Sequence, residues 1–133
     1  MINAHIRLKK ILAEVPGKLK KYDEKESSIK PSPSKWSKKE ILGHLIDSAA
    51  NNHQRFVRMQ IDDRLQLSQY KQNEWVSVQQ YQERPWKDII GMWEAYNTHI
   101  LHILSVVDKT KLSNTAVFPE YGEGWKNKIV LPS

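Results

Sequence analysis

Hydrophobic residues recur at helical spacing in three long stretches of the chain. In the first stretch, between Ile2 and Leu19, the apolar phase continues through Pro16-Gly17, so the pattern predicts one helix that is kinked at the proline. The other two stretches cover residues 41–59 and 86–107. Their apolar positions are Ile41, Leu42, Leu45, Ala49, Phe56 and Met59, then Trp86, Ile89, Ile90, Trp93, Asn97, Ile100, Leu104 and Val107. These stripes predict three long amphipathic helices and an all-α fold.

The start of the second helix carries a clear local signal. Ser37 is followed three residues later by Glu40, which is the capping-box pattern. Trp36 before the cap and Ile41 in the first helical turn form a hydrophobic staple. The helix is therefore predicted to begin at Lys38, and Asp62-Asp63 is predicted to end it.

The connecting segments have weaker patterns. Residues 22–35 are rich in charge, serine and proline, so they are predicted to be a connection without core positions. A short helix around Gln72–Gln82 is predicted to bury Trp75, Val78 and Tyr81. The tail after residue 108 lacks helical periodicity, and we expect at most a short hairpin between Val117 and Val130.

Composition narrows the class of protein. A chain of 133 residues with 39% hydrophobic and 27% charged residues is typical of a single globular domain, expected to span 1–133. No apolar stretch approaches the roughly 18 residues of a membrane span, and charges interrupt the N-terminus where a signal peptide would need apolar residues. Cysteine is absent, which excludes disulfides and thiolate ligands and fits a cytoplasmic location.

Positive charge is concentrated near the N-terminus. Residues 1–39 hold eleven Lys/Arg against four Asp/Glu, whereas residues 40–133 hold ten against eleven. This bias permits a nucleic-acid surface. However, the chain lacks an arginine cluster, a glycine-rich RNA-binding loop or interleaved aromatic residues, so a lysine-rich solvated helix face is favoured and no nucleic-acid partner is expected.

A polar row runs beside the apolar stripe of the second helix. Its members, His44, Ser48, Asn51 and Arg55, are spaced four, three and four residues apart, so successive side chains are neighbours on the helix surface. A row at the edge of an apolar face can reach into a polar pocket of a helix bundle. We therefore expect His44 to point into a solvent-open cavity near Ser48 and Asn51, although a lone histidine there is more often a structural residue.

The other four histidines are weaker candidates. His5 lies near the terminus and is expected in solvent, while His53 is expected to pack against other helices. His99 and His102 have the spacing of a metal pair. However, the stripe of their helix is centred on the opposite side, which argues against a native metal there. The chain lacks the HExxH, Ser/His/Asp and phosphate-loop patterns.

The residues 36–58, WSKKEILGHLIDSAANNHQRFVR, resemble the second helix of DinB-like proteins, which opens W-(S/T)-x-x-(E/Q)-(I/V)-x-x-H-L-x-D-S. The segment 14–19, EVPGKL, is similar to the E-V-P-x-K-L turn of the bacillithiol-transferase branch. The segments around Tyr70 to Val76 and Trp93 to His99 fit the same pattern. The resemblance implies an up-down four-helix bundle, often a homodimer, with a divalent metal, nickel or zinc, held by three histidines.

By this resemblance, His44 is the first metal ligand, and an H-x-x-x-H pair on the fourth helix supplies the other two. The sequence departs from the family pattern here, because it ends at Ser133, about where that helix would begin. We therefore expect three long helices and one short helix, a missing fourth bundle helix, an incomplete metal site, and an exposed groove that a symmetric dimer covers.

Two functions remain open. The first is a metal-dependent thiol S-transferase or hydrolase that acts on a small molecule, with a low-molecular-weight thiol as cosubstrate. The alternative is a non-catalytic dimerising helical module that has lost its metal. Neither the substrate nor the physiological metal follows from the sequence.

Overall fold

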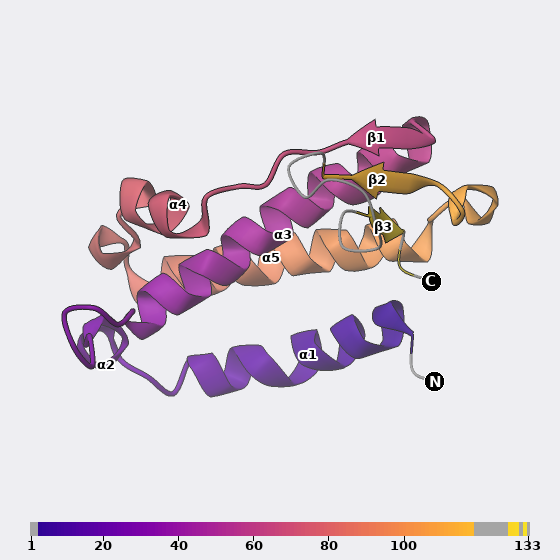
Figure 1. The fold of residues 1–133 in the computed structure, drawn as a ribbon. Helices are drawn as coiled ribbons and strands as arrows, with labels where there is room; N and C mark the ends of the chain where they lie inside the picture. Colours follow the sequence, from indigo (N-terminus) through magenta and orange to yellow (C-terminus); the bar gives the residue numbers. More distant parts are fainter. Residues whose placement is uncertain (1–2, 119–127, 131, 133) are drawn as a thin grey trace.

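The structure, a computed structural model, describes residues 3–118, 128–130 and 132. Three long helices dominate it: α1 (Ala4–Leu19), α3 (Lys38–Ile61) and α5 (Trp86–Ser105) (Figure 1). The all-α prediction is confirmed. Helix α1 continues through Pro16, as its apolar phase predicted. The Pro16 side chain is buried.

The ends of the helices follow local chemistry. Ser37 caps α3 and forms the predicted capping box with Glu40, so the helix begins at Lys38; Asp62 caps its other end. A second capping box, between Asp23 and Glu26, starts the five-residue helix α2 (Glu24–Ser28). This segment was predicted only as a connection, because a single turn is too short to show hydrophobic periodicity.

Helices α3 and α5 run in the same direction, and α1 runs opposite to both (Figure 1). At the start of both helices, Lys39 Nζ donates to the carbonyl of Gln82, which lies just before α5. At their ends, the side chain of Gln60 accepts from the backbone N–H of Asp108, which lies just after α5. From the end of α3, the chain runs back to the start of α5 through a connection that contains α4 (Gln72–Gln79) and the 3₁₀ turn η1 (Tyr81–Glu83). The up-down order therefore holds for α1 and α3, while the long connection makes α5 parallel to α3.

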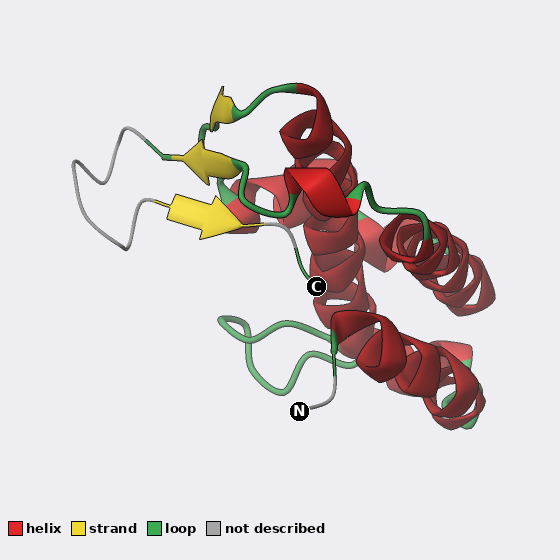
Figure 2. Cartoon of the chain, turned by 90° about the vertical axis from the view of Figure 1, so that its right-hand side faces the viewer, coloured by secondary structure: helices red, strands yellow, loops and turns green. Residues whose placement is uncertain are grey.

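A small sheet lies to one side of the helices (Figure 2). Strand β2 (Thr115–Val117) pairs antiparallel with β3 (Lys128–Val130), which confirms the predicted hairpin, and parallel with β1 (Arg64–Gln66). The sequence analysis missed β1. Three residues directly after a helix carry no alternating pattern, and the strand is stabilised by its partner from the end of the chain. A 3₁₀ turn, η2 (Lys109–Lys111), precedes β2.

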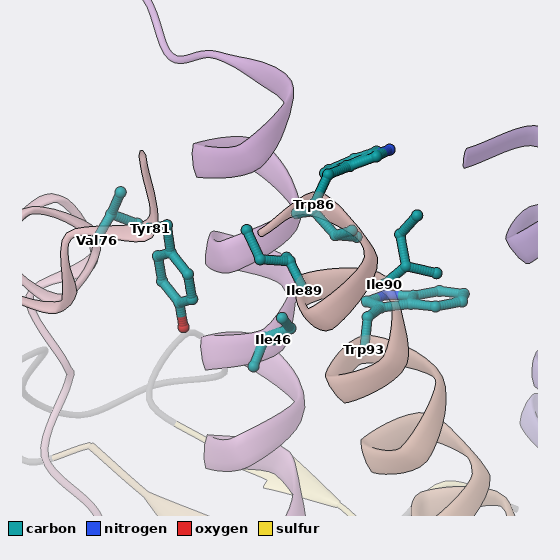
Figure 3. Close-up of a cluster of buried hydrophobic side chains, with 8 residues drawn as sticks. Ile46, Val76, Tyr81, Trp86, Ile89, Ile90 and Trp93 are labelled. Carbon is teal, nitrogen blue, oxygen red and sulfur yellow. The ribbon is translucent and has the colours of Figure 1, made fainter. Parts of the chain in front are cut away.

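The main core joins α3, α4, η1 and α5. Figure 3 shows Ile46 of α3 between Ile89 and Trp93 of α5 on one side and Tyr81 on the other. Leu12 and Leu19 of α1 pack against the same cluster. A second cluster forms where the end of α3 meets the sheet. Its buried members are Met59, Leu65, Leu67, Ala116 and Phe118.

The burial predicted for the short helix is partly wrong. Tyr81 and Val76 are buried, but Val78 is 78% exposed and Trp75 is also exposed. Helix α4 has only eight residues and packs through one narrow face, so most of its apolar side chains remain on the surface.

Part of the basic N-terminal third is used inside the protein. Lys39 is 3% exposed and its Nζ lies 2.8 Å from Glu24 Oε2. Glu24 also accepts from the backbone N–H of Trp86, at the start of α5. This contact ties α2, α3 and α5 together, so Lys39 is a structural residue and not part of a solvated face. Among the described residues, no helix is long and apolar enough to cross a membrane.

Candidate functional site

The polar row of α3 is only partly open. His44 is half-buried; its Nδ1 is fully buried and has no hydrogen-bond partner among the described residues. Its ring centroid lies 5.3 Å from that of Trp36. The side-chain amide of Asn51 donates to the backbone carbonyl of Asp47, one turn earlier, so it is hydrogen bonded within α3. The imidazole therefore packs against the Trp36 ring. The prediction that it points into a solvent-open cavity is wrong.

Asp47 is the aspartate of the H-L-x-D-S motif, but no role was predicted for it from the sequence. It is 2% exposed, and its Oδ1 accepts from Tyr81 Oη at 2.7 Å and from Gln79 Nε2 at 2.8 Å. Its Oδ2 is buried without a partner. A buried carboxylate three residues after His44 lies one helical turn away on a neighbouring part of the surface. That spacing in the sequence was the signal that could have identified it.

Gly43 makes the contact between Asp47 and Tyr81 possible. A Cβ at this position would lie 2.2 Å from Cδ2 of the Tyr81 ring. Without a side chain there, the ring lies directly on α3, on the side away from α5 (Figure 3). Burial and the hydrogen bond to Asp47 raise the pKa of Tyr81 far above its ordinary value, so its hydroxyl remains a donor at neutral pH.

The other end of the row is covered by the segment before α4. Tyr70 approaches Ser48, with 3.5 Å between the hydroxyl oxygens. Arg55 lies over the ring of Phe118 at 5.2 Å, and burial lowers the pKa of its guanidinium, which still remains charged at neutral pH. The row thus presents a hydroxyl pair at Ser48 and Tyr70, and a cation at its far end from His44.

A groove of ≈ 390 Å³ separates α1 from α3, with α5 as its floor. It lies between the three helices whose stripes predicted an exposed groove, and its cover by a dimer stays a prediction. Its apolar walls include Ile11 and Leu45, which are 42% and 44% exposed. Ser48 also lines it, whereas His44 does not. The full lining is Ala4, Leu8, Ile11, Leu45, Ser48, Ala49, Asn52, Phe56, Trp93, Asn97, Ile100, Leu104 and Pro132.

Three other histidines form a second group, with His53 on α3 and His99 and His102 on α5. The ring centroids of His53 and His99 are 4.9 Å apart, and those of His99 and His102 are 6.1 Å apart. His53 also packs on Tyr96. His53 packs against the neighbouring helix as predicted, and His99 and His102 lie exposed on the outer face of α5. The sequence did not indicate that His53 and His99 touch.

The described residues fit a three-histidine metal site only in part. The free Nδ1 of His44 fits a histidine whose second nitrogen binds a metal. Within the described ranges, however, no group of three His, Cys, Asp or Glu side chains is arranged to hold a metal ion. The described residues therefore supply one candidate ligand and not a complete site.

No protein-family model and no curated protein matches the sequence significantly. Among solved structures, YfiT from Bacillus subtilis superposes with a TM-score of 0.77 over 98% of this chain and 76% of YfiT, at 17% sequence identity. YfiT is described as a probable metal-dependent hydrolase with an unusual four-helix bundle topology. At this identity the similarity establishes the fold. The chain therefore shares the fold of the part of YfiT on which it superposes, and YfiT is described as a four-helix bundle of unusual topology.

Proposed function

We propose that the protein is a metal-dependent enzyme of the hydrolase or thiol S-transferase type that acts on a small molecule, with His44 as one metal ligand. The fold of YfiT supports a metal-dependent role. The H-L-x-D-S motif places His44 where DinB-like proteins hold their first ligand. A low-molecular-weight thiol as cosubstrate follows from the resemblance to the transferase branch.

The observation that carries this proposal is the unpaired nitrogen of His44. A buried polar atom without a hydrogen bond is costly, and such atoms often mark a group that binds an ion. His44 lies one turn before Ser48, which lines the groove between α1, α3 and α5. We propose that side chains from a segment seated in the groove, or from a second copy of the chain, complete the ligand set.

If bound with His44 as one ligand, a divalent nickel or zinc ion would supply Lewis-acid chemistry. The chain's own residues shape the surroundings. Ser48 and Tyr70 offer hydroxyl groups along the row, and Arg55 adds positive charge that favours an anionic portion of a substrate.

Metal analysis of purified protein tests the ligand. The wild-type chain, exposed to nickel or zinc and then desalted, is expected to retain metal, and His44→Ala is expected to lose it. His102→Ala is the matched control, because His102 is exposed on the far side of α5, and it should retain wild-type metal. Circular dichroism should show the same helix content in all three. Equal metal in His44→Ala and wild type would remove His44 from the site.

A second candidate is a non-catalytic dimerising module. It is favoured by the absence of a three-ligand group among the described residues and by the exposed apolar groove. Ile11→Glu places a charge in the groove, and Ile61→Glu places the same charge on an exposed isoleucine outside it. Sedimentation should show a dimer for the wild type and Ile61→Glu, and a monomer for Ile11→Glu. A protein that dimerises and binds no metal supports this candidate; a monomeric wild type contradicts it.

A further inference from the structure

Two histidines meet across the interface between the parallel helices α3 and α5. The ring centroids of His53, on α3, and His99, on α5, are 4.9 Å apart, and the rings are edge to face at 77°. His53 is half-buried and His99 is exposed, so both rings can exchange protons with solvent. Edge-to-face packing is favourable for uncharged aromatic rings. The pair therefore holds the two helices together while both imidazoles are neutral.

Few charges surround the pair. Within the described ranges, neither histidine takes part in an ion pair. From α5, Tyr96 packs against His53, and Glu94 lines a shallow surface hollow together with His99. Five residues separate Glu94 from His99, so the two side chains are not neighbours on the helix. On α3, Arg55 lies over an aromatic ring near the sheet. No carboxylate is thus placed to neutralise a proton on either imidazole in the described part of the chain.

We propose that His53 and His99 form an acid-sensitive contact, which holds α3 and α5 together when the rings are neutral and pushes them apart when both are protonated. Histidine is the side chain whose charge changes between about pH 5 and 8. Two imidazolium ions in contact repel each other, and the favourable ring packing is then opposed by like charge. The interface therefore loosens as the pH falls.

The pair lies close to the groove. Asn52 and Ile100, which directly adjoin the two histidines in the sequence, both line it. Because packed helices transmit displacements to their neighbours, a movement of α5 against α3 at the pair changes the shape of the groove. This inference does not depend on the proposed function, since it needs neither a metal nor an occupant of the groove.

Urea unfolding at pH 8 and pH 5.5 tests the pair with His53→Gln and His99→Gln. Glutamine keeps a polar side chain at each position and is uncharged at both pH values. At pH 8 each variant should have the same urea midpoint as the wild type or a lower one, because it loses the ring contact. At pH 5.5 each should have a higher midpoint, by about 0.3–0.5 M, because removal of one charge removes the repulsion. The sign of the difference thus reverses with pH.

The double variant shows whether the two histidines act on each other. Its gain at pH 5.5 should equal that of either single variant, because one charge alone has no partner to repel. His102→Gln is the matched control. Its ring stacks on that of His99 at 6.1 Å, but His102 lies in the last turn of α5, where a positive charge is favourable, so no gain is expected at pH 5.5.

Added salt separates repulsion from other causes. In 1 M NaCl, the gain of the single variants at pH 5.5 should shrink, because exposed charges at this separation are screened. The inference is overturned if His53→Gln and His99→Gln differ from the wild type by the same amount at both pH values, or if their gains add in the double variant. An equal gain in His102→Gln would place the repulsion within α5 and not between the helices.

Discussion

Replacing Gly43 by alanine is expected to destabilise the protein, although alanine normally stabilises a helix. The new Cβ would lie 2.2, 2.5 and 2.5 Å from three atoms of the Tyr81 ring, which is far inside contact distance. Tyr81 is buried among core residues and its hydroxyl is bound to Asp47, so the ring has no free space to move into. The substitution therefore displaces the ring and disturbs its hydrogen bond.

The expected magnitude combines three effects. Overpacking a core costs about 1–3 kcal/mol. A weakened hydrogen bond to a buried carboxylate costs about 1.5–3 kcal/mol. The higher helix propensity of alanine returns about 1 kcal/mol. The net loss in the free energy of unfolding is therefore about 1.5–5 kcal/mol, which is on the order of 10 °C in Tm for a chain of this size.

Urea unfolding of Gly43→Ala and Gly91→Ala gives a matched comparison. Gly91 also lies inside a long helix, but a Cβ there would meet nothing within 4 Å. Gly91→Ala should therefore gain about 0.5–1 kcal/mol. If Gly43→Ala were as stable as the wild type, or gained as much as Gly91→Ala, the close contact between Tyr81 and α3 would be wrong.

Two further predictions concern charge and burial. The hydrogen bond from Lys39, with help from the backbone of Trp86, lowers the pKa of Glu24, so this contact stabilises the fold when Glu24 is ionised and is lost as the pH falls through that lowered value. Glu24→Gln should therefore be less stable than the wild type at pH 7 but equal to it at pH 2 in urea unfolding, and an equal difference at both values would contradict the pairing. Val76→Thr should lose about 1–3 kcal/mol because Val76 is 2% exposed, whereas Val78→Thr, on the exposed side of α4, should change stability by less than about 0.5 kcal/mol. Thermal unfolding of the two variants, side by side, decides whether α4 packs through the face described.

The candidate site was predictable only in part. The motif and the polar row pointed to His44, and the three stripes pointed to the groove, because both depend on the spacing of residues along single helices. The contact between the His44 ring and Trp36 was not predicted, because Trp36 precedes the N-cap of α3 and helical periodicity does not fix the direction of its side chain. The role of Tyr81 was also hidden, because it reaches Asp47 from 34 positions away.

The sequence by itself determined the local elements. Capping at Ser37 and Glu40 sets the start of α3, and the apolar stripes indicate the extent of each long helix, because these effects act within one or two turns. The stripes predicted the buried face only in part: Ile41 and Leu45 of the predicted stripe are 48% and 44% exposed, whereas Ile46, which lay outside it, is 1% exposed. Only the tertiary structure decided what depends on distant partners. Strand β1 forms by pairing with residues 115–117, Lys39 is buried because Glu24 meets it, and Asp47 is held by residues of the α4–η1 connection. Such contacts join segments whose approach is fixed by the packing of the whole chain, and no local pattern encodes them.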